Sequence, residues 1–126
     1  MDSDETGGPT YSWIDISATG TNVVSGLDDD NYIGPFDIGF DFPFYGQTYT
    51  QFYIGSNGIV GFIEDNMQSR SPGIPSTVDP NAVLAWCWDD LDITDPDCPG
   101  GAVYYESNGS QLVIQFAGYP EYRADA

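Results

Sequence analysis

The feature that most constrains the fold of this chain is a period-two alternation of apolar residues in short runs. In residues 36–44, FDIGFDFPF, aspartate, glycine or proline separates the apolar positions Phe36, Ile38, Phe40 and Phe42. Successive side chains of a strand point to opposite faces of a sheet, so this run predicts a strand with one buried face. Pro43 predicts a sheet edge, a bulge or the strand's end, because proline has no N–H to donate.

Further strand signals follow along the chain. Residues 11–17, YSWIDIS, also alternate, and residues 82–88, AVLAWCW, have the composition of a buried strand. Two pairs of apolar runs flank Asn57-Gly58 and Asn108-Gly109, a dipeptide that a type I′ hairpin turn favours because both turn positions need positive φ. Residues 64–81, rich in serine, proline and asparagine, read as a loop.

Helix signals are almost absent, because glycine or proline interrupts nearly every window with a helical period. The pattern therefore predicts an all-β fold, an antiparallel β-sandwich or a jelly-roll-like fold of about seven strands. A length of 126 residues fits one domain over residues 1–126, with residues 1–8 as a flexible lead-in. Aromatic residues make up 15% of the chain, which favours a packed core despite a net charge of −18.

The charge excludes several functions. The chain has no lysine and no histidine, and its only basic residues are Arg70 and Arg123. Nucleic acids and anionic membranes need a cationic surface, so we expect neither as a partner, and no apolar run is long enough for membrane insertion. Catalysis through histidine or lysine is impossible. Adjacent strand residues such as Asp89 and Asp90 face opposite ways, so a carboxylate pair is not indicated and we expect no enzyme.

The segment CWDDLDITDPDC places five aspartates between the only two cysteines, Cys87 and Cys98. Carboxylates are hard oxygen ligands that suit calcium, although the spacing does not match an EF-hand. A second acidic run, DDDN at residues 28–31, either forms its own site or meets the first. The predicted metal ligands are Asp89, Asp90, Asp92, Asp95, Asp97, Asp28, Asp29 and Asp30. The alternative is a pair of solvated surface loops.

The number of cysteines is even, and in an extracellular protein an even number favours pairing, here as a disulfide between Cys87 and Cys98. The alternative is a buried Cys87 on its strand and an exposed thiol at Cys98. Trp86 and Trp88 are expected on one face of the same strand, with Cys87 on the other. These two tryptophans could stack on sugar rings, but packing in the core is the more common role of aromatic side chains.

Four segments, PTYSWIDISATGT, FDFPFYGQTYTQFYIGSNGIVGF, LAWCWDDLD and VYYESNGSQLVIQF, resemble a β-sandwich module of large secreted bacterial proteins. Those proteins also carry subtilisin-like protease domains, fibronectin type III repeats or C-terminal sorting domains. The resemblance implies an extracellular or cell-surface location and no catalytic residues. Such modules usually continue with two more strands after the run LVIQF, whereas this sequence stops at PEYRADA. Either the sequence is a fragment that lacks its C-terminal strands, or the missing strands come from another chain. A fold that is short as it stands would leave an unpaired sheet edge.

Together these observations predict a non-catalytic, extracellular structural or adhesive module stabilised by calcium. Its partners would be the other domains of a larger secreted protein. One alternative is a carbohydrate-binding accessory domain that recognises polysaccharide. The other alternative is the subunit of an extracellular fibre, which would self-associate by adding a strand to the open sheet edge.

Overall fold

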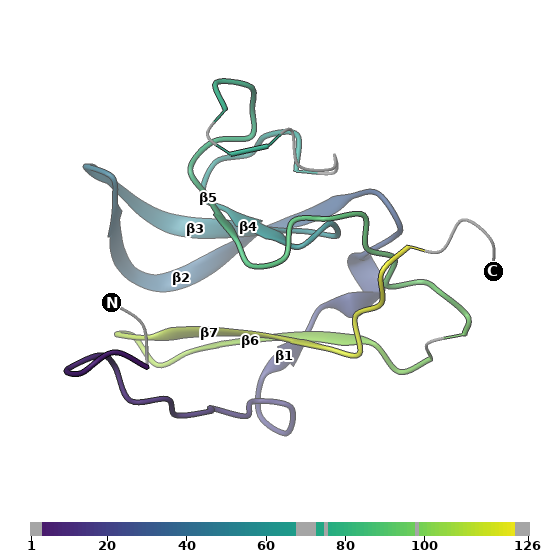
Figure 1. Ribbon diagram of the computed structural model, residues 1–126, viewed down its shortest axis with the longest axis horizontal. Coiled ribbons are helices and arrows are strands. Elements are labelled where there is room, and N and C mark those ends of the chain that lie inside the picture. The colour runs from purple at the N-terminus through teal and green to yellow at the C-terminus, as the bar shows by residue number, and fades with distance from the viewer. Residues whose placement is uncertain (1–3, 68–72, 75, 98, 123–126) are drawn as a thin grey trace.

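The computed structural model describes residues 4–67, 73–74, 76–97 and 99–122, which form two antiparallel sheets stacked in layers (Figure 1). One sheet has three strands in the order β1-β6-β7, and the other has four in the order β2-β3-β4-β5. The predicted β-sandwich of seven strands is therefore confirmed. The elements are β1 (Thr21–Asn22), the 3-10 helix η1 (Val24–Gly26), β2 (Tyr32–Phe44), β3 (Gln47–Gly55), β4 (Ile59–Gly61), β5 (Val83–Ala85), β6 (Ala102–Ser107) and β7 (Leu112–Ala117).

The alternating run at residues 36–44 lies in β2 and directs its apolar side chains toward the layer between the sheets. Ile38 is buried at its centre, and the aromatic rings of the run pack around the buried cluster. Pro43 pairs with Thr48 one residue before the end of β2, which is an edge strand, so the expectations of a sheet edge and of the strand's end are both confirmed. A register shift between Asp37 and Phe42 lies just before it. The core cluster consists of Leu27, Ile38, Phe52, Ile54, Val60, Phe62, Ile93 and Val103.

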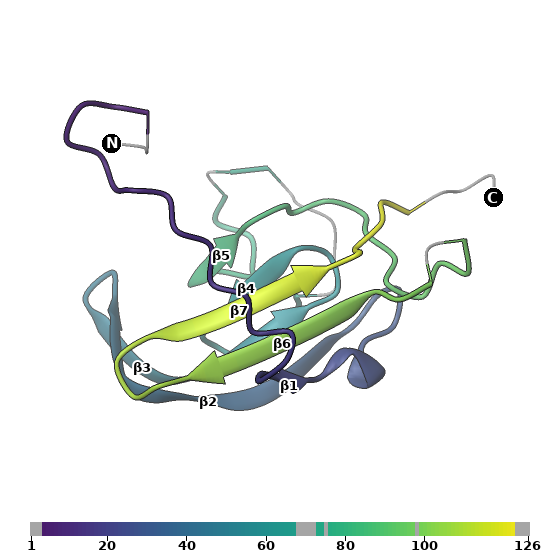
Figure 2. The ribbon, with the colours of Figure 1, turned by 90° about the horizontal axis from the view of Figure 1, so that it is seen from below.

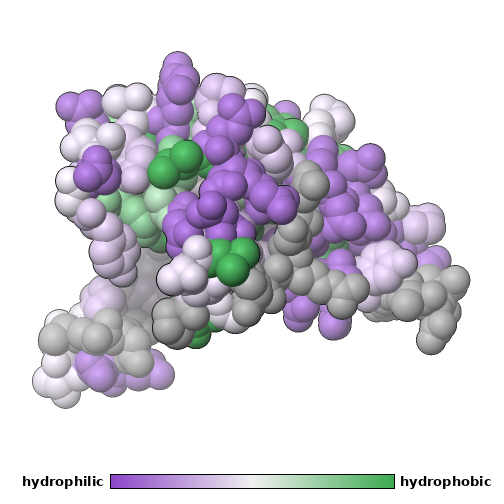
Figure 3. All heavy atoms as spheres, turned by 90° about the horizontal axis from the view of Figure 1, so that it is seen from above, coloured by the Kyte–Doolittle hydropathy of each residue, from purple (hydrophilic) through white to green (hydrophobic). Residues whose placement is uncertain are grey.

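A second, smaller cluster lies on the outer face of the four-stranded sheet. Tyr53 and Ile59 alternate with the core residues of β3 and β4, so their side chains point away from the other sheet. Met67, from the loop that follows β4, is fully buried against them. Figure 3 shows that hydrophilic residues cover much of this side of the molecule, with separate hydrophobic patches among them.

The hairpins at the two Asn-Gly dipeptides form as predicted, but not with type I′ turns. Gly55 pairs with Ile59, which leaves a three-residue turn, and only Gly58 in it has positive φ. Asn108-Gly109 opens a four-residue turn in which again only the glycine has positive φ. The two-residue turn with positive φ at both positions lies between β2 and β3 at Tyr45-Gly46, where the sequence carries no asparagine.

Two predicted strands differ in the structure. Residues 11–17 form no strand but cross the outer face of the three-stranded sheet, held by hydrogen bonds of Asp15 and Ile16 to the side chain of Gln115 (Figure 2). The strand expected at residues 82–88 is the short edge strand β5, and it is not buried, since Leu84 is 46% exposed. The strand ends at Ala85 because the next two N–H groups, of Trp86 and Cys87, both donate to the Gly58 carbonyl.

No helix within the described ranges is long and apolar enough to cross a membrane. The one helix there, η1, has three residues.

Candidate functional site

The two acidic segments of the sequence meet at one corner of the sandwich. Residues 28–30 follow η1 and precede β2, and residues 89–92 follow β5. One side-chain oxygen from each of Asp29, Asp30 and Asp90 lies within 4.8 Å of the other two. These three residues are called the acidic corner below. The sequence left open whether the two segments form one site or two, and the structure brings them together.

Asn57, from the turn between β3 and β4, joins the two acidic segments. Its side chain is fully buried. Its Nδ2 donates to Asp30 Oδ1 at 2.8 Å, and its Oδ1 accepts from the Leu91 N–H at 2.9 Å. One amide therefore fixes a carboxylate of the first segment and the backbone of the second. The Asn-Gly dipeptide predicts a turn at Asn57, and nothing in the sequence indicates this second role.

Ser56 and Asn31 fix the first acidic segment against the same turn. The Ser56 N–H donates to the Asn31 carbonyl at 2.8 Å, and the Asn31 N–H donates to Ser56 Oγ at 2.9 Å. The Asn31 side chain also accepts from the Asp28 N–H and donates to the Gly26 carbonyl. Ser56 is fully buried, so its bond with the Asn31 N–H is partly shielded from water, whereas the two bonds of the Asn31 side chain are exposed.

Electrostatic repulsion is concentrated on Asp29. Burial raises the pKa of Asp29 above its ordinary value, and the negative charges of Asp92, Asp30, Asp90 and Asp28 raise it further. Its Oδ1 atom is buried and has no hydrogen-bond partner among the described residues. A proton or a cation at this oxygen would relieve both the burial of the charge and the repulsion.

The other predicted ligands mostly organise their own loops. Asp92 Oδ1 accepts from the N–H and the hydroxyl of Thr94, at 2.8 and 2.6 Å. Asp95 is buried, and its Oδ1 accepts from the Asp97 N–H. Asp28 and Asp89 each accept a hydrogen bond from the N–H of the residue that follows. Short-range bonds of this kind are the usual way in which aspartate stabilises a turn.

The cysteines and tryptophans near β5 have different environments. Cys87 is exposed, and Cys98 lies outside the described residues, so the disulfide stays a prediction. Trp86 faces the other sheet and stacks on Phe116, with ring centroids 4.3 Å apart. Trp88 packs instead on the outer cluster with Tyr53. The expectation that both tryptophans share one face is wrong, because β5 ends before Trp86.

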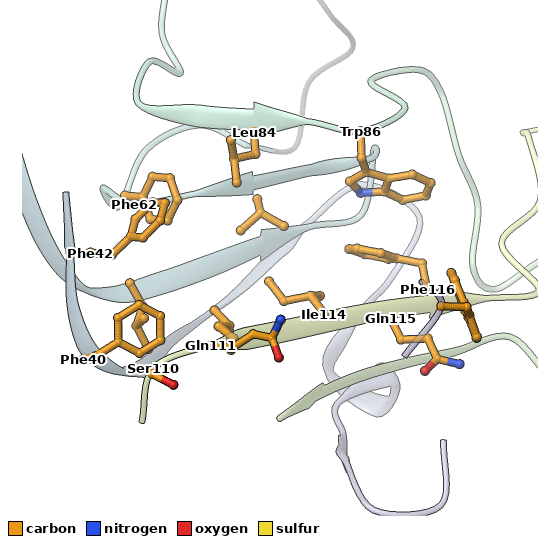
Figure 4. A pocket seen from close by; sticks show the side chains of 14 residues that line it. Phe40, Phe42, Phe62, Leu84, Trp86, Ser110, Gln111, Ile114, Gln115 and Phe116 are labelled. Atoms are coloured by element: carbon orange, nitrogen blue, oxygen red, sulfur yellow. The ribbon is translucent and has the colours of Figure 1, made fainter. Parts of the chain in front are cut away.

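A large apolar cleft opens between the sheets on the side where β5 and β7 form the sheet edges (Figure 4). Its volume is about 790 Å³. The aromatic and aliphatic side chains that line it include Phe40, Phe42, Phe62, Leu84, Trp86 and Phe116. The sequence pattern does not predict this cleft, since alternation indicates which face of a strand is apolar but not how completely that face is covered.

Two stacked antiparallel sheets with polar loops at one corner define the chain as a β-sandwich domain. The model of the NIDO-related family matches residues 3–118, so the chain belongs to that family. NIDO is an extracellular domain, which gives a coarse indication that this chain is extracellular too. Comparison with curated proteins and with solved structures gives no match. The specific association with secreted bacterial proteases or sorting domains stays a prediction.

Proposed function

We propose that this chain is a non-catalytic, structural or adhesive extracellular module whose acidic corner binds calcium. The observation that supports calcium best is the convergence of Asp29, Asp30 and Asp90, whose oxygens lie within 4.8 Å of one another. Calcium prefers several oxygen ligands in a flexible arrangement, and this corner offers oxygens from two loops. Its role would be to hold the two loops together.

The donor set fits a calcium ion on two further grounds. All three side chains are carboxylates, which suit a hard cation rather than zinc or copper. The buried Asp29 Oδ1 atom has no hydrogen-bond partner in the described part of the chain, so a cation there would not displace an existing bond of that atom. The ion would also offset part of the net charge of −18.

A thermal melt with calcium and with excess chelator, at fixed ionic strength, tests this proposal. An ion bound only by the folded state stabilises it by RT ln(1 + [L]/Kd), about 2.7 kcal/mol at a hundredfold excess over Kd. We expect calcium to raise the midpoint and magnesium to raise it less, because magnesium demands stricter geometry.

The matched variants separate a site from general charge screening. Asp29→Asn with Asp90→Asn removes two corner carboxylates, and Asp37→Asn with Asp41→Asn removes two exposed ones from β2. We expect the calcium-dependent rise in the midpoint of the thermal melt to disappear in the first variant and to persist in the second. An equal loss in both variants, or no rise in the unmodified chain, would reduce the corner to solvated charge.

The carbohydrate-binding alternative receives less support than the structural module. Trp86 and Trp88 lie on opposite faces of the four-stranded sheet, so they do not form a common platform for a sugar ring. Trp86 faces a cleft whose lining is mostly apolar, whereas sugars need several hydrogen-bonding groups as well as a stacking surface.

A further inference from the structure

The apolar cleft lies beside one edge strand of each sheet. β7 ends the three-stranded sheet and β5 ends the four-stranded sheet, and no other described strand pairs with their outer sides. An edge strand presents a row of N–H and C=O groups that can accept another strand. The six residues of β7 offer a longer row than the three of β5.

The side chains of β7 continue this edge into the cleft. Leu112, Ile114 and Phe116, at every second position, line the cleft and are half-buried. Figure 4 shows Ile114 and Phe116 on β7. On the opposite sheet Leu84 and Trp86 are 46% and 44% exposed at the mouth of the cleft. A strand added to β7 would place its own alternate side chains between these two rows.

The chemistry of the lining favours an extended peptide over a sugar or another polar ligand. The polar side chains that line the cleft are Ser110, Gln111 and Gln115, and the Gln115 amide already bonds to Asp15 and the Ile16 N–H. The Ser110 hydroxyl donates to Asn108 Oδ1, so the hydrogen-bonding groups that remain beside the cleft are the Gln111 amide and the backbone of β7. A peptide strand uses that backbone for affinity and apolar pockets for its alternate side chains.

Charge indicates which kind of strand fits. The chain has a net charge of −18, from 20 acidic and two basic residues. The two basic residues, Arg70 and Arg123, lie outside the described residues. A second copy of this chain would bring the same negative charge and be repelled, whereas a basic partner would be attracted.

We propose that the apolar cleft and the open edge of β7 accept a β-strand from a different polypeptide. That strand carries apolar residues at alternate positions, which enter the cleft, and neutral or basic residues between them, which face solvent. It adds to β7 and extends the three-stranded sheet. The inference does not depend on the calcium site.

Titration calorimetry with synthetic peptides tests the proposal, with tryptophan fluorescence as a second readout because Trp13 and Trp86 line the cleft. The probe is a peptide of about nine residues that alternates isoleucine or valine with lysine. One control has the same composition with its apolar residues in a block, and the other has glutamate in place of lysine. At about 0.15 M salt we expect saturable binding of the probe and binding at least about tenfold weaker for both controls.

Two variants of the chain locate the binding. Leu84→Asp places a charge at the mouth of the cleft, where the side chain is already 46% exposed, so the fold should tolerate it. Tyr45→Asp adds the same charge on the β2–β3 turn, where Tyr45 is 92% exposed and does not line the cleft. We expect Leu84→Asp to weaken probe binding by about tenfold or more and Tyr45→Asp by less than about twofold.

Three results would overturn the proposal. Equal binding of the block peptide would show attraction by charge alone, and equal loss in both variants would place the binding elsewhere. Concentration-dependent self-association of the chain without any peptide, abolished by Leu84→Asp, would make a second copy the occupant instead.

Discussion

The tripeptide Ser-Asn-Gly occurs twice in this chain, and the two copies have different environments. The first copy, residues 56–58, follows β3 and forms its hairpin turn, whereas the second, residues 107–109, starts at the last residue of β6 and continues into its turn. In the first copy Ser56 and Asn57 are fully buried, and their side chains bond to residues 25 to 34 positions away. In the second copy Asn108 is exposed, and within the described part of the chain its bonds reach only Ser110 and Gln111.

The difference teaches that a local signal fixes the turn but not its role. In both copies the glycine supplies the positive φ that the chain reversal needs. Only the first turn lies beside two acidic loops, so only there do the asparagine and serine find partners distant in sequence. Paired substitutions at equivalent positions of the two copies therefore measure what tertiary context adds to the same three residues.

The largest difference in stability between the two copies is expected when their glycines, Gly58 and Gly109, are replaced. Both have positive φ, +80° at Gly58 and +89° at Gly109, so alanine is strained at both. A Cβ at Gly58 would overlap the Cys87 carbonyl oxygen, whereas none of the described atoms lies within 4 Å of one at Gly109. We expect Gly58→Ala to lower the free energy of unfolding by about 3–4 kcal/mol and Gly109→Ala by about 1–2 kcal/mol, measured by urea denaturation. Equal losses would contradict the close approach.

The asparagines should give the next largest contrast. Asn57→Ala removes the acceptor of the buried Leu91 N–H and a donor to Asp30, so we expect a loss of about 2–3 kcal/mol. Asn108→Ala breaks only exposed bonds within its turn, and we expect about 0.5–1 kcal/mol. The calcium-dependent rise in melting temperature should also shrink in Asn57→Ala alone. If both variants respond to calcium like the unmodified chain, Asn57 does not organise the metal ligands.

The serines should differ less. Ser56→Ala leaves the Asn31 N–H without its acceptor in a part-buried position, with an expected loss in the free energy of unfolding of about 1–2 kcal/mol. Ser107 Oγ accepts from the Gly109 N–H at 3.3 Å in an exposed turn, so Ser107→Ala should change stability by less than about 0.5 kcal/mol. Chemical denaturation of the two variants in parallel measures the difference. A larger loss at Ser107 would show that the second turn has an unrecognised role.

The smallest effect concerns pH. The pKa of Asp29 is raised in the folded state, so its ionised form destabilises the fold at neutral pH. In chelator, the free energy of unfolding should therefore rise as pH falls from 7 through the raised pKa, and Asn at this position should flatten that rise. With saturating calcium the sign should reverse, since protons compete with the ion for the same oxygen. Melts over this pH range in Asp29→Asn and Asp41→Asn test both signs.

Much of the fold was predictable because alternation reports directly on a strand with one buried face. The apolar runs that flank the two Asn-Gly dipeptides located β3, β4, β6 and β7, and alternation located β2. It failed at residues 11–17, where the backbone crosses a sheet instead of pairing with it, and at β5, where apolar composition suggested burial for an edge strand. Alternation reports which side chains are apolar. It does not report whether the backbone of that segment pairs with a strand on either side.

Of the candidate site, only the presence of the acidic residues was predictable from the sequence. The aspartates were visible in the sequence, but which three converge depends on the packing of two loops against one turn. Asn57 had no distinguishing signal, since Asn108 stands in the same tripeptide. The apolar cleft likewise depends on the spacing of the two sheets along their open side, which no single strand encodes.

The hydrogen bonds of Asn57 span 27 and 34 residues, so one amide closes two long segments of chain. Closing such segments is entropically unfavourable until the flanking strands are in place, which slows non-local contacts relative to hairpins. We therefore expect the β2–β3 and β6–β7 hairpins to form early in folding and the acidic corner late. In that order Asn57→Ala should accelerate unfolding and leave the refolding rate nearly unchanged, so that the corner governs how long the folded domain persists rather than how fast it is reached.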